Sequence, residues 1–534
     1  MDDVIIRDVA AQAGHILERA RWAARSYAEY DAGSVQRIVD AVAKAAHASA
    51  RDYAEWAVRE TTFGVVEHKV KKNEACSLGL LEIYRNEDFV TPRVDAAKRI
   101  VEVPRPAGVV LAITPSTNPI ATVYFKVLIS LMTRNAVVIS PHPMAKQCSA
   151  DAAKALCAAA VDAGAPDGIV QCIEDPTIPL VESLMADERT NVIVATGGTG
   201  VVRAAYGSGN PAIGVGPGNV PVLVDGTANL AEAARYIVES KAFDNSVLCT
   251  NESVLIVEDQ AAEPLLREMS RLGAFVLSPQ EAQILSAYMF PFGRLNTEVV
   301  GKDASTIARA AGLKAGPKTR LLIAPFDMVT PDEPMAHEKL SPVLGMVRVR
   351  NAEDGIDAAR SVVRIAGAGH SAAIHSTDPA TVMRYTARVP VLRVAVNVGN
   401  SEGSSGLSTN LALTMTVGTG FVGRSSLGEN LQPKHLINCA KIAYNSDTSI
   451  PFPDFGGLSP WRSCSGPVPP YPVASNASEA GRPSVRAHSL NGVTNQLADG
   501  IGNGLGAGRG MDDQRFRTEV RRLVIEELSQ LLKD

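Results

Sequence analysis

The sequence lacks any run of 18 consecutive apolar residues, so we expect no membrane-spanning helix. Its first ten residues, MDDVIIRDVA, have no basic stretch followed by an apolar one, which predicts a cytoplasmic protein without a signal peptide. The 7 cysteines form no C-x-x-C pair and no zinc-finger spacing, so we expect reduced thiols and no metal site. Lys and Arg number 52 against 57 Asp and Glu, and this balance offers nucleic acid no basic surface.

The apolar pattern of the 534 residues predicts an α/β protein. Residues 37–60 carry apolar side chains at helical spacing, and alanine is dense throughout residues 1–90. From about residue 100, short β-branched runs such as VVLAIT (109–114) and VPVLVD (220–225) alternate with helical stretches. This alternation indicates parallel sheets with helices on both faces, in two α/β domains that we place at 1–228 and 229–446.

The composition changes near residue 447. Residues 447–510 are rich in Pro, Gly and Ser, which predicts a flexible linker because such a segment buries little apolar surface. Residues 511–534 follow with apolar side chains along one stripe and Arg and Glu opposite, the pattern of an amphipathic helix.

One cysteine has the setting of a nucleophile. Cys249 lies in KAFDNSVLCTNESVLIVE (241–258), after a predicted helix and before a predicted strand, among polar residues. A thiolate on such a loop can attack a carbonyl carbon. The residues alone leave a second interpretation open, in which Cys249 is a small buried filler of the core.

Four further segments accompany the Cys249 loop. They are ITPSTNPIATVYFKVLISLMTRNAVVISPHPMAK (113–146), VATGGTGVVRAAYGSGNPAIGVGPGNVPVLVD (194–225), AHEKLSPVLGMV (336–347) and ENLQPKHLIN (429–438). Together the five segments resemble the CoA-acylating aldehyde dehydrogenases, among them the dehydrogenase half of bifunctional aldehyde-alcohol dehydrogenases and the propionaldehyde and acetaldehyde enzymes of bacterial microcompartments. The resemblance covers roughly residues 20–445. It implies a Rossmann-type NAD-binding domain in residues 1–228, and a catalytic α/β domain with a bridging segment, used in oligomerisation, in residues 229–446.

The resemblance also implies roles for individual residues. Cys249 is expected to be the nucleophile, and the Asn118 amide and the Cys249 backbone N–H are expected to face the oxyanion. For Asn118 the alternative is a turn residue before Pro119.

The implied contacts to NAD lie in three of the segments. Ser140 and His142 stand where the family contacts the adenosine ribose, and Glu338 stands where it binds the nicotinamide ribose. The pyrophosphate and nicotinamide are expected to pass Thr196, Gly197, Gly198 and Thr199. From pattern alone, the TGGTG run (196–200) is equally a plain tight turn and Glu338 a solvated charge.

The segment IGVGPGN (213–219) indicates the reaction subtype. Hydrolytic relatives carry a glutamate here that activates water, whereas this chain has Gly214 or Val215 and no acid between Asn210 and Pro221. Coenzyme A supplies its own thiol and needs no such base. We therefore expect a CoA-acylating, NAD-dependent aldehyde dehydrogenase that oxidises a short-chain aldehyde, with propionaldehyde favoured. Two alternatives on the same fold are a hydrolytic dehydrogenase that makes a free acid and a reductase that acts on an acyl phosphate. A third alternative is a catalytically silent assembly protein.

The binding site of coenzyme A is not apparent in the sequence. Arg134, Arg203 and Lys241 are candidate phosphate contacts, with exposed surface charge as the favoured alternative for each.

The C-terminal helix resembles the encapsulation peptides of bacterial microcompartment enzymes. This resemblance implies that residues 511–534 bind a shell or cargo protein through the apolar stripe, and that the enzyme resides inside a microcompartment. The helix is alternatively an oligomerisation element of a dimer or tetramer, or it docks on its own subunit.

Overall fold

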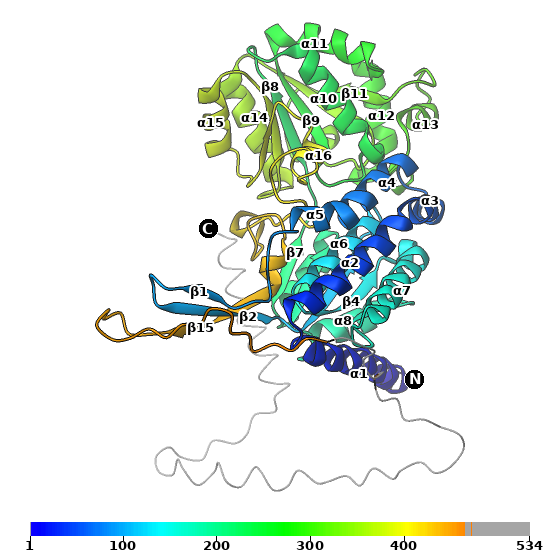
Figure 1. Ribbon diagram of the computed structural model, residues 1–534. Helices are drawn as coiled ribbons and strands as arrows, with labels where there is room; N and C mark the ends of the chain where they lie inside the picture. Colours follow the sequence, from blue (N-terminus) through cyan, green and yellow to red (C-terminus); the bar gives the residue numbers. More distant parts are fainter. Residues whose placement is uncertain (1, 465–470, 472–534) are drawn as a thin grey trace, which may run out of the picture. The chain divides into compact units, whose positions relative to one another are not determined.

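The computed structural model describes residues 2–464 and 471, and across these residues the strands form three sheets (Figure 1). The predicted amphipathic helix 511–534 and most of the predicted linker lie outside the described residues. Within the part of the chain that is described, no helix combines the length and apolarity needed to cross a bilayer.

The N-terminal region is helical, as the alanine-rich pattern predicts. The periodic run 37–60 is divided at Ser49, where one helix ends and the next begins. Asp31 caps the first of these helices by accepting a hydrogen bond from the backbone N–H of Ser34 at 2.8 Å. The elements are α1 (Asp2–Tyr27), α2 (Ala32–Ala48), α3 (Ala50–Thr61), α4 (Val66–Glu74), the π-helical turn η1 (Ala75–Gly79) and α5 (Leu80–Ile83).

The first α/β sheet is parallel and has the strand order β5-β4-β3-β6-β7. The chain runs outward from β3 in one direction and then returns to add β6 on the other side. The carboxyl ends of β3 and β6 therefore diverge at a topological switch point, where ligands bind in open parallel sheets. The strands are β3 (Val109–Thr114), β4 (Ala136–Pro141), β5 (Val170–Cys172), β6 (Val192–Thr196) and β7 (Ala212–Val215), and the helices are α6 (Pro119–Met132), α7 (Lys146–Asp162), α8 (Ile178–Ala186) and α9 (Thr199–Gly207), with the short 3₁₀ turn η2 (Pro143–Ala145) before α7.

The second α/β sheet is also parallel, in the order β10-β11-β12-β9-β8-β13-β14, with an apolar cluster on each face. Its strands are β8 (Val220–Val224), β9 (Glu252–Glu258), β10 (Ala274–Val276), β11 (Leu321–Pro325), β12 (Val343–Val349), β13 (Ala372–His375) and β14 (Val394–Val396). Its helices are α10 (Leu230–Ala242), α11 (Asp259–Arg271), α12 (Pro279–Met289), α13 (Ala304–Ala310), α14 (Ala352–Ile365), α15 (Pro379–Arg388) and α16 (Asn400–Gly403), with 3₁₀ turns η3 (Phe243–Ser246) and η6 (Pro334–Ala336).

The boundary between the two α/β domains differs from the expected position after residue 228. Strand β8 pairs with β9 and β13 of the second sheet, whereas β7 pairs with β6 of the first. The chain therefore crosses between residues 215 and 220. The sequence does not show where the chain passes from one sheet to the other, because β7 and β8 are both short apolar runs. A strand that is buried on both of its faces has this pattern in either sheet.

A third, antiparallel sheet joins segments that are far apart in the sequence. It consists of β1 (Arg93–Asp95), β2 (Ile100–Pro106) and β15 (Ile437–Ala443), with β2 in the centre. In Figure 1 these strands form an arm that leaves the first α/β domain, matching the expected bridging strands.

The described start of the predicted linker is bound to the N-terminal region rather than free. Arg99 donates hydrogen bonds to the carbonyls of Asn445 and Ile450, each at 2.6 Å. Further on, the Trp461 indole donates to the Val90 carbonyl at 2.8 Å and stacks on the guanidinium of Arg134, 4.1 Å from the ring centroid. The composition of a segment indicates how little apolar surface it can bury within itself. It does not show which other part of the protein the segment contacts.

The contacts of Trp461 predict that Trp461→Ala destabilises the protein. The change removes an indole from a half-buried site and leaves the Arg134 cation without its aromatic neighbour, a loss of about 2 kcal/mol. Thermal unfolding should show a melting temperature lowered by several degrees. Leu458→Ala is the matched control, because Leu458 belongs to the same segment but is 62% exposed. Equal melting temperatures for the two variants would contradict the assigned contact.

Candidate active site

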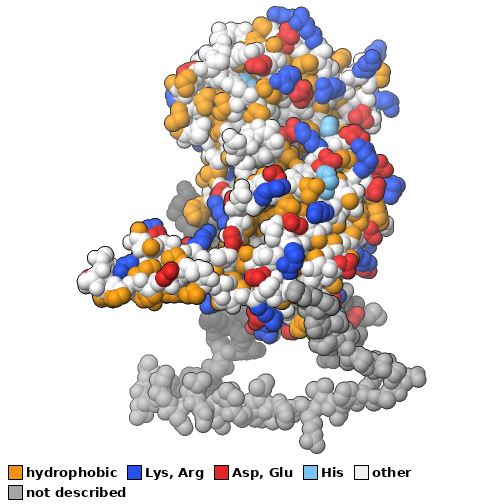
Figure 2. Space-filling model, viewed as in Figure 1, with side chains coloured by type: hydrophobic (Ala, Val, Ile, Leu, Met, Phe, Trp, Pro, Cys, Tyr) orange, Lys and Arg blue, Asp and Glu red, His pale blue; other side chains and the backbone are white. Residues whose placement is uncertain are grey.

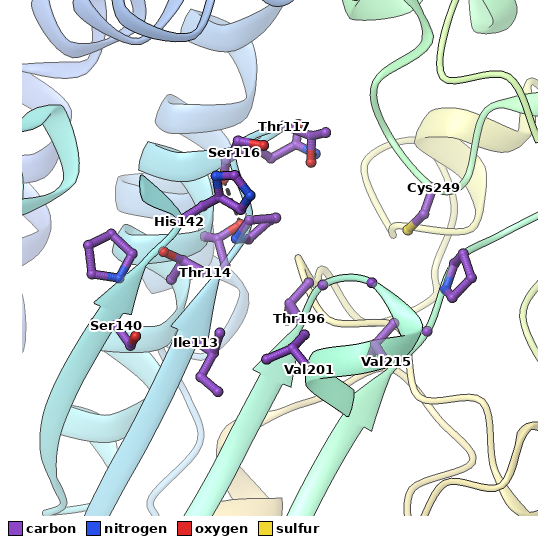
Figure 3. Close-up of a pocket in the computed structure, with 18 of the residues that line it drawn as sticks. Ile113, Thr114, Ser116, Thr117, Ser140, His142, Thr196, Val201, Val215 and Cys249 are labelled. Carbon is purple, nitrogen blue, oxygen red and sulfur yellow. Dashed lines mark hydrogen bonds between the residues drawn. The ribbon is translucent and has the colours of Figure 1, made fainter. Parts of the chain in front are cut away.

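A cavity of about 640 Å³ lies between the two α/β domains (Figure 3). Its walls come from the carboxyl ends of β3, β4 and β6, from the loop after β7, and from the loop between α10 and β9. The cavity is lined by eight of the nine residues proposed from the sequence: Asn118, Ser140, His142, Thr196, Gly197, Gly198, Cys249 and Glu338. The ninth, Thr199, is the first residue of α9 beside this wall.

Cys249 stands on a loop whose backbone is strained. Asp244, Asn245 and Ser246 have successive φ angles of 51°, 50° and 62°, a left-handed conformation that is unfavourable for residues with a Cβ atom. On the other side of the loop, the backbone packs so closely that a Cβ on Gly218 would lie 2.0 Å from the Cys249 carbonyl oxygen. The loop is therefore held from two directions, and the partly exposed Cys249 side chain lines the cavity.

The surroundings of the Cys249 thiol favour its protonated form. Burial raises the pKa of Cys249 to about 12, the charge of Glu338 adds to the rise, and Arg393 opposes it. Burial also raises the pKa of Glu338 to about 8, so this carboxyl group exchanges its proton near neutral pH.

Asn118 directs its amide nitrogen toward the same loop. It occupies the position before α6, yet its side chain caps no backbone N–H of that helix. The amide nitrogen makes two long contacts instead, 3.2 Å to the Thr117 hydroxyl and 3.4 Å to the Val247 carbonyl. Among the hydrogen bonds within residues 2–464, none has the backbone N–H of Cys249 as its donor. The Asn118 amide and the Cys249 backbone N–H therefore make no short hydrogen bond among the described residues, and both residues line the cavity.

The opposite end of the cavity has the features of a phosphate site. Gly198 is the N-cap of α9, and no side chain caps the first turn of the helix, so its backbone N–H groups and positive dipole end remain for an anion. A Cβ on Gly198 or Gly200 would meet nothing within 4 Å, which shows open space on this side. The Thr114 hydroxyl also lines the cavity and is buried without a partner among the described residues. This donor set fits the pyrophosphate of a dinucleotide.

The ribose candidates lie at two places along the cavity. Ser140 is the penultimate residue of β4. His142 follows the strand, and its Nδ1 accepts a hydrogen bond from the Met144 backbone at 3.2 Å. Burial lowers the pKa of His142, which keeps the imidazole neutral. Glu338 lines the cavity together with Cys249. No group of three or more His, Cys, Asp and Glu that could hold a metal ion occurs within the described part of the chain.

The wall at residues 214–218 resolves an ambiguity that the sequence left open. A Cβ on Gly214 would lie 2.7 Å from both Tyr206 and Val202, so no larger side chain fits there. Val215 is the residue of this pair that lines the cavity. Across the described lining, the carboxylates are Glu182 and Glu338, and neither comes from this wall.

Comparison with known proteins identifies the family of this chain. The model of the aldehyde dehydrogenase family matches residues 5–408. The chain belongs to the aldehyde dehydrogenase family. This finding confirms the family and fold expected from the five segments.

Three relatives illustrate the similarity. The bifunctional aldehyde-alcohol dehydrogenase of Escherichia coli is 36% identical over 446 residues, which cover 82% of this chain and 50% of the relative, so this chain spans about half the length of that protein. The structure of an acetylating aldehyde dehydrogenase from Geobacillus thermoglucosidasius is 37% identical with a TM-score of 0.81, covering 84% of this chain and 99% of that one. The Rhodopseudomonas palustris propionaldehyde dehydrogenase with bound propionyl-CoA is 27% identical with a TM-score of 0.73, covering 81% and 94%.

Two of the candidate phosphate contacts in this chain are not surface charges. Arg134 is fully buried and donates to the carbonyls of Ala28 and Pro104 at 2.6 and 2.8 Å. Lys241 is buried and donates to the Ser246 hydroxyl at 2.7 Å. Arg203 is exposed on α9. Exposed surface charge, the favoured interpretation, was therefore wrong for Arg134 and Lys241. Nothing in the local sequence distinguishes a buried, hydrogen-bonded lysine or arginine from one in solvent.

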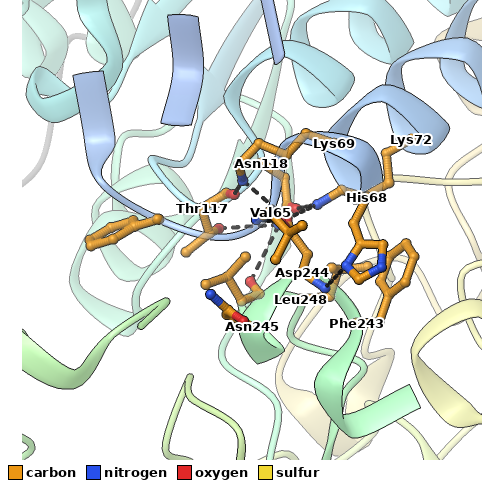
Figure 4. A network of polar contacts seen from close by, with 12 residues as sticks. Val65, His68, Lys69, Lys72, Thr117, Asn118, Phe243, Asp244, Asn245 and Leu248 are labelled. Atoms are coloured by element: carbon orange, nitrogen blue, oxygen red, sulfur yellow. Dashed lines mark hydrogen bonds and ion pairs between the residues drawn. The ribbon is translucent and has the colours of Figure 1, made fainter. Parts of the chain in front are cut away.

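Sequence reasoning also missed charged residues that contact the site. Lys69, Lys72 and Asp244 form a buried cluster next to Asn118 (Figure 4). The helical pattern of residues 66–74 gave no signal, because the partners are more than 40 residues apart in the chain.

The raised pKa of Cys249 predicts how its alkylation depends on pH. Only the thiolate reacts, so below a pKa of about 12 the rate of iodoacetamide labelling at Cys249 should rise about tenfold per pH unit between pH 7 and pH 9. Mass spectrometry of the peptide that contains Cys249 measures this rate, and Cys439, on the bridging sheet, serves as the internal comparison. A plateau of the Cys249 rate below pH 9 would show that the thiol is already ionised and would contradict this assignment.

Proposed function

We propose that this aldehyde dehydrogenase oxidises a short-chain aldehyde with NAD and transfers the acyl group from Cys249 to coenzyme A. The observation that carries the proposal is the composition of one cavity. It brings Cys249 and Asn118 together, and it has Val215 and glycines where a hydrolytic enzyme requires a glutamate. The acetylating relative and the relative with bound propionyl-CoA support the same reaction.

The cavity offers a site for each part of the cofactor. The first turn of α9, with Gly197, Gly198 and Thr199, would hold the pyrophosphate. Ser140 and His142 would contact the adenosine ribose, and the Glu338 carboxylate would accept hydrogen bonds from the nicotinamide ribose. When bound there, the nicotinamide supplies the acceptor for a hydride.

The chain's own residues then perform the oxidation. Cys249 loses its proton, for which Glu338 is the acceptor suited by its raised pKa, and the sulfur adds to the aldehyde carbonyl. The new oxyanion accepts hydrogen bonds from the Asn118 amide and the Cys249 backbone N–H. Loss of hydride from the former carbonyl carbon leaves a thioester on Cys249.

Transfer to coenzyme A follows from what the cavity lacks. A thioester needs either an activated water or a better nucleophile, and the wall at Gly214 and Val215 provides no base for water. The sulfur of coenzyme A attacks the thioester, its proton passes to the departing sulfur of Cys249, and acyl-CoA and the Cys249 thiol are released. Val247, Leu340 and Val417 line the cavity with Cys249 and favour a short apolar aldehyde, with propionaldehyde as our first candidate.

We also propose that the enzyme is a dimer or tetramer assembled through the bridging sheet. Strands β1 and β15 are the edges of this sheet, and edge strands can pair with another chain. Val94 and Ile442 on these edges are 40% and 39% exposed, and Figure 2 shows hydrophobic side chains along this arm.

A measurement of NADH formation with propionaldehyde and NAD, with and without coenzyme A, tests the reaction. We expect steady turnover only with coenzyme A, none in Cys249→Ala, and a loss of about 10²–10³-fold in kcat for Asn118→Ala. Cys439→Ala is the control cysteine variant and should keep full activity. Steady turnover without coenzyme A would mean that water reaches an activated thioester. Absence of turnover with every short aldehyde would favour a catalytically silent assembly protein.

We propose that residues 511–534 bind a microcompartment shell or cargo protein, which rests on the amphipathic sequence pattern. Residues 1–472 form one compact unit that contains the whole cavity. A chain that ends at residue 472 should therefore keep its kcat/KM and its oligomeric state but lose co-purification with shell proteins. A changed oligomeric state on size-exclusion chromatography would instead identify the segment as an oligomerisation element.

A further inference from the structure

A buried cluster of charged side chains contacts Asn118. Lys69 and Lys72 of α4 both pair with the carboxylate of Asp244 in η3, and the side chains of all three are at most 4% exposed. Lys69 also donates to the Thr117 carbonyl at 2.9 Å, whereas Lys72 donates to the Asn118 side-chain oxygen. Figure 4 shows the two lysines reaching successive residues of the loop that leads into α6.

The contact between Lys72 and Asn118 determines which way the amide points. A lysine ammonium group has three donors and no acceptor, so only the amide oxygen can face it. Turning the amide by half a revolution would place its NH₂ against the ammonium and lose the hydrogen bond. With the oxygen bound to Lys72, the nitrogen faces the loop of Val247 and Cys249. The nearby positive charge also withdraws electron density from the amide and strengthens its N–H groups as donors.

Other buried lysines of this chain show that Lys72 is not simply a lysine that needed partners. Lys126 satisfies its ammonium with the carbonyls of Ile113 and Val194 at 2.6 and 2.8 Å. Lys339 donates to the Met335 carbonyl at 2.8 Å and to further oxygens beside it. Both interact with groups that hold the fold together. Lys72 instead donates to a side-chain amide that lines the catalytic cavity.

We infer that Lys72 is a positioning residue, which holds and polarises the Asn118 amide so that its nitrogen donates to the oxyanion formed at Cys249. The inference rests on the proposed function, because it assigns to Asn118 the stabilisation of that oxyanion.

Asp244 connects the Lys72–Asn118 contact to the loop that carries Cys249. Its carboxylate holds Lys72 and accepts a hydrogen bond from the Val65 backbone at 2.7 Å, and its own backbone N–H donates to His68 at 2.8 Å. Asp244 is also the first left-handed residue of the strained turn that leads to Cys249. Burial alone would raise the pKa of Asp244, but the two lysines lower it, so the carboxylate stays charged. The donor and the nucleophile are thus positioned by the same group.

The test compares two neutral replacements of similar length, Lys72→Met and Lys72→Gln. Both remove the charge opposite Asp244, but only glutamine can still donate a hydrogen bond to the Asn118 oxygen. The readout is the single-turnover formation of NADH without coenzyme A, which reports the step that Asn118 serves and is independent of acyl transfer. The rate constant of a single turnover does not depend on the fraction of active enzyme, so misfolded protein lowers only the amplitude of NADH formation.

We expect Lys72→Met to lower this rate constant by about 10–100-fold, with the aldehyde concentration for half-maximal rate changed less than about threefold. Lys72→Gln should recover a large part of the loss. In the Asn118→Ala background, the same Lys72→Met change should cost less than about threefold, because the group it positions is absent. Lys69→Met, which contacts Asp244 but not the Asn118 side chain, should reduce the rate by the same factor in both backgrounds.

Equal rates for the methionine and glutamine variants, or the same Lys72→Met factor with and without Asn118, would overturn the inference and leave Lys72 a structural residue. A normal NADH burst without later CoA-dependent turnover would refute the proposed acyl transfer alone. The two failures are therefore distinguishable.

Discussion

The buried carboxylate of Asp244 is the interaction on which the geometry of the site depends. It lies where α4 of the N-terminal region meets the turn between α10 and β9. Its two oxygens accept from Lys69, Lys72 and the Val65 backbone, so it ties residues 65–72 to the turn that carries Asp244. Gly64 is required beside it, because a Cβ there would lie 2.1 Å from the carboxylate and the backbone φ is +82°. Because Lys69 and Lys72 bind both Asp244 and the loop of Thr117 and Asn118, these ion pairs hold the Cys249 loop next to the Asn118 loop.

The charges in this cluster are costly to bury and therefore strongly coupled. Removing a charged group from water costs several kcal/mol, and an ion pair offsets that cost only when each member keeps its partners. Two lysines and one aspartate leave an excess of one positive charge beside the oxyanion site. An excess positive charge in a buried site favours the anion that forms when sulfur adds to a carbonyl. The arrangement that fixes the fold at this point is thus also suited to the chemistry.

The sequence predicted the parts of this protein that depend on local pattern. The strands β3, β4, β6 and β9 were found because short β-branched runs alternate with helices, and the family match confirms the resemblance of the segments around Asn118, Cys249 and Glu338. The domain boundary was missed because β7 and β8 have the same apolar pattern in different sheets. The contact of Lys72 with Asn118 was missed, and Lys241 was interpreted as an exposed charge, because a contact over 46 residues, or a buried lysine on a helix, leaves no periodic trace.

The central claim is that the thiol of coenzyme A, and not water, attacks the thioester on Cys249. Intact-protein mass spectrometry tests it most directly, on enzyme given propionaldehyde and NAD without coenzyme A. The account predicts an acyl adduct on Cys249 that persists in buffer and disappears as acyl-CoA forms when coenzyme A is added. An adduct that is lost to water at the same rate with and without coenzyme A would contradict it.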